Sequence, residues 1–226
     1  MQPFLDRCPE LLPELQRWVT AGRIAICGGY ANVRVNHVEG ETFVRSMIYG
    51  RRAFRTLFPT ADLSVHADLV DVAWGHPQLP QLLRQAGYQY LRGWRPHDAL
   101  NAKGIPHHFR WRGLDGSEVL CSRGSYGGIY HPDYIPSGYQ DRWSEVVQFW
   151  EQHELGEKRE HAPVPLLWVQ QGADDNRPLR SIFGIDTPLD LVGFIQEWNR
   201  REASRMRFAT PVEAFAELER WRDQIP

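Results

Sequence analysis

Apolar residues recur every three or four positions in six stretches of the chain, which is the period of an amphipathic helix. The longest stretch, residues 39–58, carries Phe43, Met47 and Phe54 on one face. Proline or glycine stands near the ends of several others, where helices begin or stop. The pattern predicts helices over residues 9–21, 39–58, 78–87, 143–155, 187–201 and 211–221.

Short apolar runs lie between these helices and are typical of strands. Two alternating runs around a Leu-Asp-Gly-Ser turn predict a β-hairpin over residues 107–122. Since strand and helix alternate through most of the chain, the sequence predicts one α/β domain, residues 1–226, with a mainly parallel sheet that is open or closed into a barrel. The other predicted strands are residues 23–27, 63–70, 88–94, 164–171 and 205–209.

The composition is that of an ordinary globular protein, with 42% hydrophobic and 24% charged residues and a net charge of −2. It gives no indication of a broad surface for nucleic acid or an anionic membrane, and no apolar run is long enough to span a bilayer. The first residues lack the basic head and apolar stretch of a secretory signal, so we expect a cytoplasmic protein. The three widely spaced cysteines fit buried thiols.

The aromatic content is high, with nine Trp, eight Tyr and ten Phe. Aromatic side chains are most often part of the core. They also form platforms for the apolar faces of sugar rings, so the count gains functional meaning only beside other evidence for carbohydrate.

Candidate catalytic residues stand at the ends of predicted strands, where functional groups gather in parallel α/β folds. Asp71 follows the strand predicted at 63–70, Trp94 and Arg95 follow the strand residues 88–93, and Asp174 and Asp175 follow the strand predicted at 164–171. Two acids on one rim suit a glycoside hydrolase, in which one carboxylate attacks or stabilises the anomeric carbon and the other protonates the leaving oxygen. The competing interpretation is structural, because an Asp after a strand is also common as a helix N-cap or turn residue.

Six segments carry a further signal through their order along nearly the whole chain. They read GRIAICGGY, EGETFVRSMIYGRRAFRTLF, DVAWGHPQLPQLLRQAGYQY, PHHFRWRGLDGSEVL, WVQQGADDNRP and RFATPVEAFAEL. In this order they resemble the N-terminal catalytic domain of glycoside hydrolase family 38, the α-mannosidases. One departure is the turn after Asp71, where Gly75 stands one place later than the family's glycine while the spacing to Leu79-Pro80-Gln81 is retained.

The resemblance implies a mainly parallel, incomplete (β/α)7-type barrel with an inserted β-hairpin. It implies retaining hydrolysis of α-mannosidic bonds in a mannose-containing oligosaccharide or glycoside. Asp71 would be the nucleophile and also a zinc ligand, and Asp174 would be the acid/base, with Asp175 as the alternative. Trp94, Arg95 and Asp175 would line the sugar pocket.

Zinc is the cofactor that the resemblance implies, but most of the family's zinc ligands have no counterpart in this sequence. His66-Ala67-Asp68 has the letters of the family's His-x-Asp pair. Alternation places both side chains on one face of a strand, where we expect packing or hydrogen bonding. For His107-His108, alternation predicts one inward and one outward side chain.

Several accounts of the whole chain remain open. We expect an enzyme fragment of a zinc-binding parent, inactive alone. The alternative is a non-catalytic carbohydrate-binding or structural remnant of the same fold. A polysaccharide-deacetylase-like barrel is a further interpretation, although the sequence has no two histidines four residues apart, as such enzymes need. We expect no nucleic-acid or membrane partner, and the sequence does not predict an oligomeric state.

Overall fold

The computed structural model of the protein describes several stretches of the chain, and their contacts define two compact units. Unit 1 comprises Met1–Pro96, Phe109–Ser122 and Ala209–Asp223, and unit 2 comprises His97–His108, Arg123–Phe208 and Gln224–Pro226. The described residues are 2–31, 33–60, 66–69, 75–123, 132–170, 181–182, 185–186 and 189–226.

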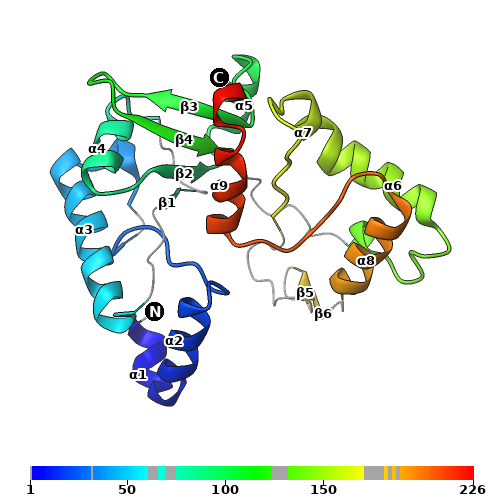
Figure 1. Ribbon diagram of the computed structural model, residues 1–226, viewed down its shortest axis with the longest axis horizontal. Helices are drawn as coiled ribbons and strands as arrows, with labels where there is room; N and C mark the ends of the chain where they lie inside the picture. The colour runs from blue at the N-terminus through cyan, green and yellow to red at the C-terminus, as the bar shows by residue number, and fades with distance from the viewer. Residues whose placement is uncertain are drawn as a thin grey trace. The chain divides into compact units, whose positions relative to one another are not determined.

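Unit 1 is centred on a four-stranded sheet with helices beside it (Figure 1). The strands are β1 (His66–Leu69), β2 (Tyr90–Gly93), β3 (His108–Arg112) and β4 (Glu118–Ser122). The helices are α1 (Gln2–Arg7), α2 (Leu12–Thr20), α3 (Gly40–Leu57), α4 (Leu79–Gln85) and α9 (Pro211–Glu219), with 3₁₀ turns at Pro9–Leu11, Val35–His37 and Arg222–Gln224.

The sheet has the strand order β1-β2-β4-β3 and is parallel across β1, β2 and β4. Leu69 at the end of β1 pairs with Gly93 at the end of β2. β3 and β4 form the predicted hairpin, and the Gly113 N–H donates to the Ser117 carbonyl at 2.8 Å across its turn. The predicted α/β class with a mainly parallel sheet is therefore confirmed.

Helix α3 contacts the segment that precedes it at Gly50. A Cβ at this position would lie 2.5 Å from the Gly29 carbonyl carbon and 2.5 Å from the Tyr30 nitrogen, so only glycine permits the approach. The Tyr30 N–H donates to the Ser46 carbonyl at 2.7 Å and fixes the contact. The segment is thus held on the helix rather than in the sheet.

Helix α9 begins with a capping box, in which the Glu213 carboxylate accepts from the Thr210 N–H at 2.7 Å and the Thr210 hydroxyl accepts from the Glu213 N–H at 3.4 Å. One turn later Phe215 is fully buried and stacks on Tyr90 of β2, with the ring centroids 4.7 Å apart. The cap fixes where the helix starts, and the stacked pair fixes it against the sheet.

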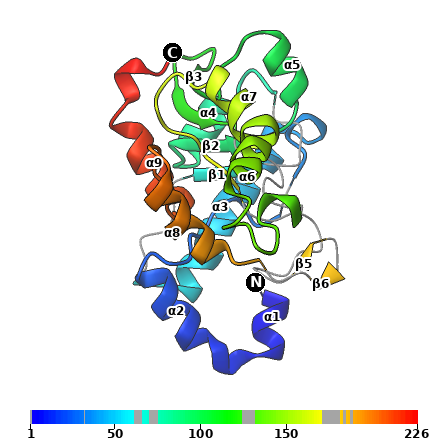
Figure 2. The ribbon, with the colours of Figure 1, turned by 90° about the vertical axis from the view of Figure 1, so that its right-hand side faces the viewer.

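Unit 2 is mainly helical, and Figures 1 and 2 both show α6 and α8 side by side in it. Their contact is an aromatic core, in which Trp150 stacks on Phe194 at a centroid distance of 5.1 Å and Trp143 and Trp198 pack around the pair. Part of the high aromatic content is therefore core. The elements are α5 (His97–Ala102), α6 (Trp143–Trp150), a π-helical turn (Glu151–Leu155), α7 (Gly156–Glu160), α8 (Leu191–Arg201), β5 (Ser181–Ile182), β6 (Ile185–Asp186) and a 3₁₀ turn (Pro132–Tyr134).

Each of the six predicted helices is confirmed, five of them with shorter bounds, and the predicted strands at 63–70 and 88–94 are confirmed as β1 and β2. The helix predicted over 143–155 continues through the π-helical turn into α7. None of the helices in the described stretches combines the length and the apolar character needed to cross a bilayer.

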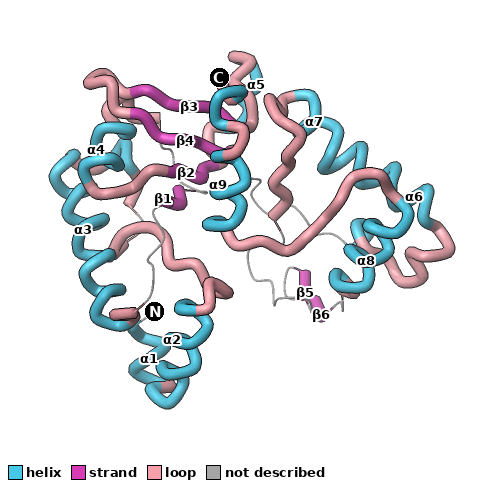
Figure 3. The backbone as a smooth tube through the Cα atoms, viewed as in Figure 1, coloured by secondary structure: helices cyan, strands magenta, loops and turns pink. Residues whose placement is uncertain are grey.

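Three predicted strands are wrong for the residues that the structure describes. Residues 23–27, 164–170 and 205–209 run as irregular loops (Figure 3). Their apolar side chains are nevertheless used, since Ile26 is buried against the α2–α3 cluster and Leu167 packs on the core of unit 2. Packing against helices removes these side chains from water without a ladder of strand hydrogen bonds.

Candidate functional site

The carboxyl ends of the parallel strands meet at one edge of the sheet in unit 1. Leu69 and Gly93 are direct partners in the register of β1 and β2, and Ser122 ends β4 opposite Arg92. The chain therefore leaves all three strands at the same edge. Functional groups of parallel α/β folds collect at this edge.

Two of the five predicted site residues lie in the described part of the chain. Trp94 directly follows β2 and is half-buried, and Arg95 is exposed beside it. Both therefore leave the sheet at the edge where the sequence predicts them. Asp71, Asp174 and Asp175 lie outside the described residues.

An ion pair between Asp68 and Arg92 lies one residue before the ends of β1 and β2. The two residues are partners in the strand register, and Asp68 Oδ2 accepts from Arg92 Nη2 at 2.6 Å and from Nε at 3.0 Å. Both side chains are largely buried, at 19% and 11% exposure. The expectation of hydrogen bonding for Asp68 is confirmed, and these two charge-assisted hydrogen bonds to one oxygen link the neighbouring strands.

The buried pair also affects a neighbouring thiol. Burial raises the pKa of Cys27 to about 11, and the nearby Asp68 carboxylate contributes to the increase. A thiol with so high a pKa stays protonated at neutral pH and is a poor nucleophile or metal ligand. Of the three cysteines predicted to be buried thiols, Cys121 is buried, whereas Cys8 and Cys27 are half-buried.

Within the described stretches, no group of three or more His, Cys, Asp or Glu side chains could hold a metal ion. A zinc site needs three or four such ligands. Asp68 is engaged by Arg92, and Asp71, the one residue to which the resemblance assigns zinc, lies outside these stretches. The described residues thus do not fit the expected zinc site.

A histidine network in unit 2 differs from the sequence prediction. The expectation of one inward and one outward side chain for His107-His108 is wrong, because they are only 3% and 2% exposed. His107 Nε2 lies 3.9 Å from Glu157 Oε1, and His108 Nε2 lies 3.0 Å from the Leu166 carbonyl. The two rings are therefore buried in different surroundings: His107 lies near Glu157 of α7, and His108 lies against the loop that contains Leu166.

The hydrogen bonds indicate which ring nitrogens carry the protons. His107 Nδ1 faces the Arg123 carbonyl at 3.3 Å and His108 Nε2 faces the Leu166 carbonyl; since a carbonyl only accepts, these nitrogens donate. The other nitrogens, His107 Nε2 and His108 Nδ1, are buried without a hydrogen-bond partner in the described residues. Burial lowers the pKa of both rings to about 4, because a charged imidazolium there would lose its hydration.

Arg123, the residue after β4, is the centre of this network. Its guanidinium is almost fully buried and donates to the Asn101 Oδ1 at 2.6 Å and to the Pro106 carbonyl at 3.0 Å. Asn101 in turn donates to Glu157 Oε1 at 2.8 Å. Arg123 is thereby tied to α5 and, through Asn101, to α7. Sequence reasoning missed it, and its only sequence signal is its place directly after a strand.

We expect the free energy of unfolding of unit 2 to decrease as the pH is lowered from about 7.5 to about 5.5. The unfolded chain takes up protons at His107 and His108 near their ordinary pKa of 6.5, whereas the folded chain keeps both neutral until about pH 4. Each histidine therefore costs about 1 kcal/mol of stability over this interval. Urea unfolding followed by tryptophan fluorescence measures the loss, since Trp150 and Trp198 lie in the core of unit 2.

The variant His108→Gln tests this origin of the pH dependence. Glutamine can donate to the Leu166 carbonyl but does not titrate. The unfolding free energy of this variant should therefore change less with pH, by the contribution of one histidine. The same replacement at exposed His37 is the control. An equal slope in the two variants would contradict the assignment.

Comparison with known proteins gives a family match over nearly the whole chain and relatives that match parts of it. Residues 2–226 match the family described as "Glycosyl hydrolases family 38 N-terminal domain". Alpha-mannosidase G from Dictyostelium discoideum is 31% identical over 121 residues, which is 51% of this chain and 10% of that protein. Alpha-mannosidase 2C1 from Homo sapiens is 28% identical over 146 residues, which is 63% of this chain and 13% of that protein.

A solved structure has a similar fold. It is that of an alpha-mannosidase from Enterococcus faecalis V583, with a TM-score of 0.66 and 17% identity over 99% of this chain and 23% of that chain. At this identity the likeness concerns the fold alone. The matched region spans about a tenth of the length of the two curated relatives.

Proposed function

We propose that this chain, which belongs to glycosyl hydrolase family 38 as its N-terminal domain, supplies catalytic groups to a retaining α-mannosidase. The observation that carries the proposal is the parallel register of β1 and β2, whose last residues Leu69 and Gly93 are partners. Asp71 follows the first of these by two residues and Trp94 follows the second directly. A nucleophile and a sugar-binding side chain on neighbouring strands then start from one edge of the sheet.

The two relatives with curated names support the type of substrate. Both are called alpha-mannosidases, and they match 51% and 63% of this chain. We infer that the substrate is an α-mannoside, such as a mannose-containing oligosaccharide.

In the proposed mechanism the Asp71 carboxylate attacks the anomeric carbon and forms a glycosyl ester. The bond to the leaving oxygen breaks as Asp174 gives that oxygen its proton. Asp174 then takes a proton from water, which attacks the anomeric carbon, restores the Asp71 carboxylate and releases the sugar with retained configuration. Trp94, Arg95 and Asp175 are proposed to contact the sugar.

Asp71 is the one residue that we propose as a zinc ligand. When bound in such a site, the ion would hold and orient sugar hydroxyls. Because the described residues provide no set of three ligands, the mechanism above uses no step on the ion.

We also propose that residues 1–226 form one domain, an incomplete (β/α)7-type barrel with the β3–β4 hairpin inserted. The three parallel strands β1, β2 and β4 and the crossover helices between strands support this architecture.

Trapping the covalent intermediate tests the proposed function. An activated fluorinated mannoside forms the glycosyl ester but slows its hydrolysis, so we expect the protein that carries these residues to gain the mass of one fluorinated sugar. Peptide mapping should place the added mass on the peptide that contains Asp71. Labelling at another carboxylate would contradict the assignment, and binding of mannoside without labelling or turnover would favour a non-catalytic carbohydrate-binding protein.

A further inference from the structure

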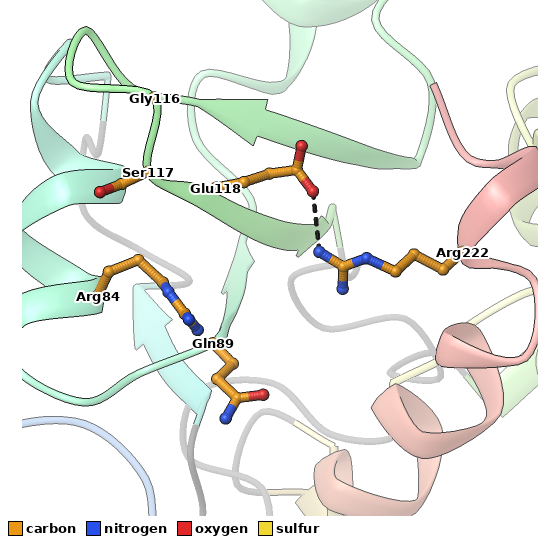
Figure 4. A pocket seen from close by; sticks show the side chains of 6 residues that line it. All are labelled: Arg84, Gln89, Gly116, Ser117, Glu118 and Arg222. Carbon is orange, nitrogen blue, oxygen red and sulfur yellow. Dashed lines mark hydrogen bonds and ion pairs between the residues drawn. The ribbon is translucent and has the colours of Figure 1, made fainter.

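A second polar site, a pocket of about 440 Å³, lies at the opposite end of the sheet in unit 1. Figure 4 shows the side chains that line it. Gln89 directly precedes β2, and Ser117 and Glu118 stand at the start of β4. Arg84 of α4 and Arg222 after α9 complete its lining. Since the strands are about 13 Å long, this amino-end pocket is separate from the carboxyl edge of the proposed catalytic site.

Hydrogen-bond donors outnumber acceptors in the amino-end pocket. Arg222 donates from Nη1 to Glu219 and from Nη2 to Glu118, both at 2.8 Å, and a guanidinium has five N–H groups, so three remain. No hydrogen bond links the side chain of Arg84 or Gln89 to another described residue, and in Figure 4 the Arg84 guanidinium extends toward Gln89.

The carboxylate that lines the pocket, Glu118, is already paired with arginine. Glu118 Oε1 accepts from Arg222, and its other oxygen lies 3.7 Å from Arg112 Nη2. The charged side chains that line the pocket, Arg84, Arg222 and Glu118, carry a net charge of +1. A ligand that only accepts hydrogen bonds and is negatively charged suits this surplus of donors and positive charge.

We propose that the amino-end pocket binds a small oxyanion, specifically a phosphate group, between Arg84 and Arg222. Its volume falls within the range of about 300–1,000 Å³ that is common for small-molecule sites. The two guanidiniums provide charge and forked N–H donors, and Gln89 adds its amide N–H groups. Because Arg84 is exposed and Arg222 is 37% exposed, we expect a dissociation constant in the millimolar range.

The test is a titration of the 226-residue chain with inorganic phosphate at constant ionic strength, followed by amide NMR shifts. We expect saturable shifts at Gln89 and Gly116, which line the pocket. The variant Arg84→Gln should weaken binding about tenfold or more, because a charged donor is lost. Arg55→Gln on α3 removes the same charge from an exposed position away from the pocket and should leave binding unchanged.

Equal affinities of the Arg84→Gln and Arg55→Gln variants, or shifts that sodium chloride alone reproduces, would overturn the proposal. A hexose 6-phosphate and the unphosphorylated hexose distinguish the sources of the phosphate group. Equal binding of the hexose phosphate and of inorganic phosphate supports a free anion as the ligand, and tighter binding of the hexose phosphate supports a phosphorylated sugar. Binding of the unphosphorylated hexose with the same affinity would refute an oxyanion site. None of these readouts involves Asp71 or turnover, so their failure leaves the proposed function untouched.

Discussion

Replacement of Asp71 with alanine is expected to lower kcat for an aryl α-mannoside at least about a thousandfold. The reason is that the proposed mechanism passes through a covalent bond to this carboxylate, and alanine has no atom that can form it. Steady-state hydrolysis by the protein that carries these residues measures the effect. Asp141→Ala removes an exposed carboxylate of the described part of unit 2 and should leave kcat within about twofold, as for other surface changes.

An azide rescue experiment separates a lost nucleophile from a damaged fold. In Asp71→Ala the vacated space admits a small anion, which can attack the anomeric carbon directly. The expected product is a mannosyl azide of inverted configuration, because only one displacement occurs. Unchanged hydrolysis in Asp71→Ala, or an azide product with retained configuration, would remove Asp71 from the role of nucleophile.

The helices could be predicted from the sequence because their hydrogen bonds are local. The pattern of Phe43 and Met47 on α3 and the Thr210–Glu213 capping box of α9 are each contained in a few consecutive residues. No information from distant parts of the chain is needed to place them. The confirmation of all six helices reflects this independence.

Strands depend on a partner, and the sequence correctly predicted only those whose partners are specified nearby. β3 and β4 are joined by a short turn, and β1 and β2 flank a single helix. Residues 23–27, 164–170 and 205–209 have the same apolar character, yet they pack on helices or run as loops. A run of apolar residues indicates that a segment is buried. It does not indicate whether a neighbouring strand forms backbone hydrogen bonds with that segment.

The site could be predicted in part for the same reason. Trp94 and Arg95 follow the carboxyl end of β2 as predicted, because the local pattern specifies where this strand ends, while their contact with a sugar stays a prediction. The buried network of Arg123, His107 and Glu157 could not be predicted, because its members are distant in sequence and meet only after unit 2 has folded.

The second large effect is expected at Asp174, and it should depend on the leaving group. Asp174→Ala should lower kcat/KM for a mannosyl disaccharide by about 10²–10⁴, because a sugar alkoxide needs a proton to leave. For a dinitrophenyl mannoside the same variant should lose much less activity in the first step, since that phenolate leaves without protonation. The ratio of the two losses, measured by kcat/KM, identifies the acid/base.

Asp175→Ala is the matched control, since it removes an equal charge one residue away. If Asp175 only contacts the sugar, its removal should raise KM for both substrates to a similar extent, because uniform binding is lost. Azide should rescue Asp174→Ala with retained configuration, as it then attacks the glycosyl ester on Asp71. A leaving-group dependence that appears in Asp175→Ala and not in Asp174→Ala would move the acid/base to Asp175. If neither variant showed a dependence on the leaving group, neither aspartate would be the group that protonates the leaving oxygen.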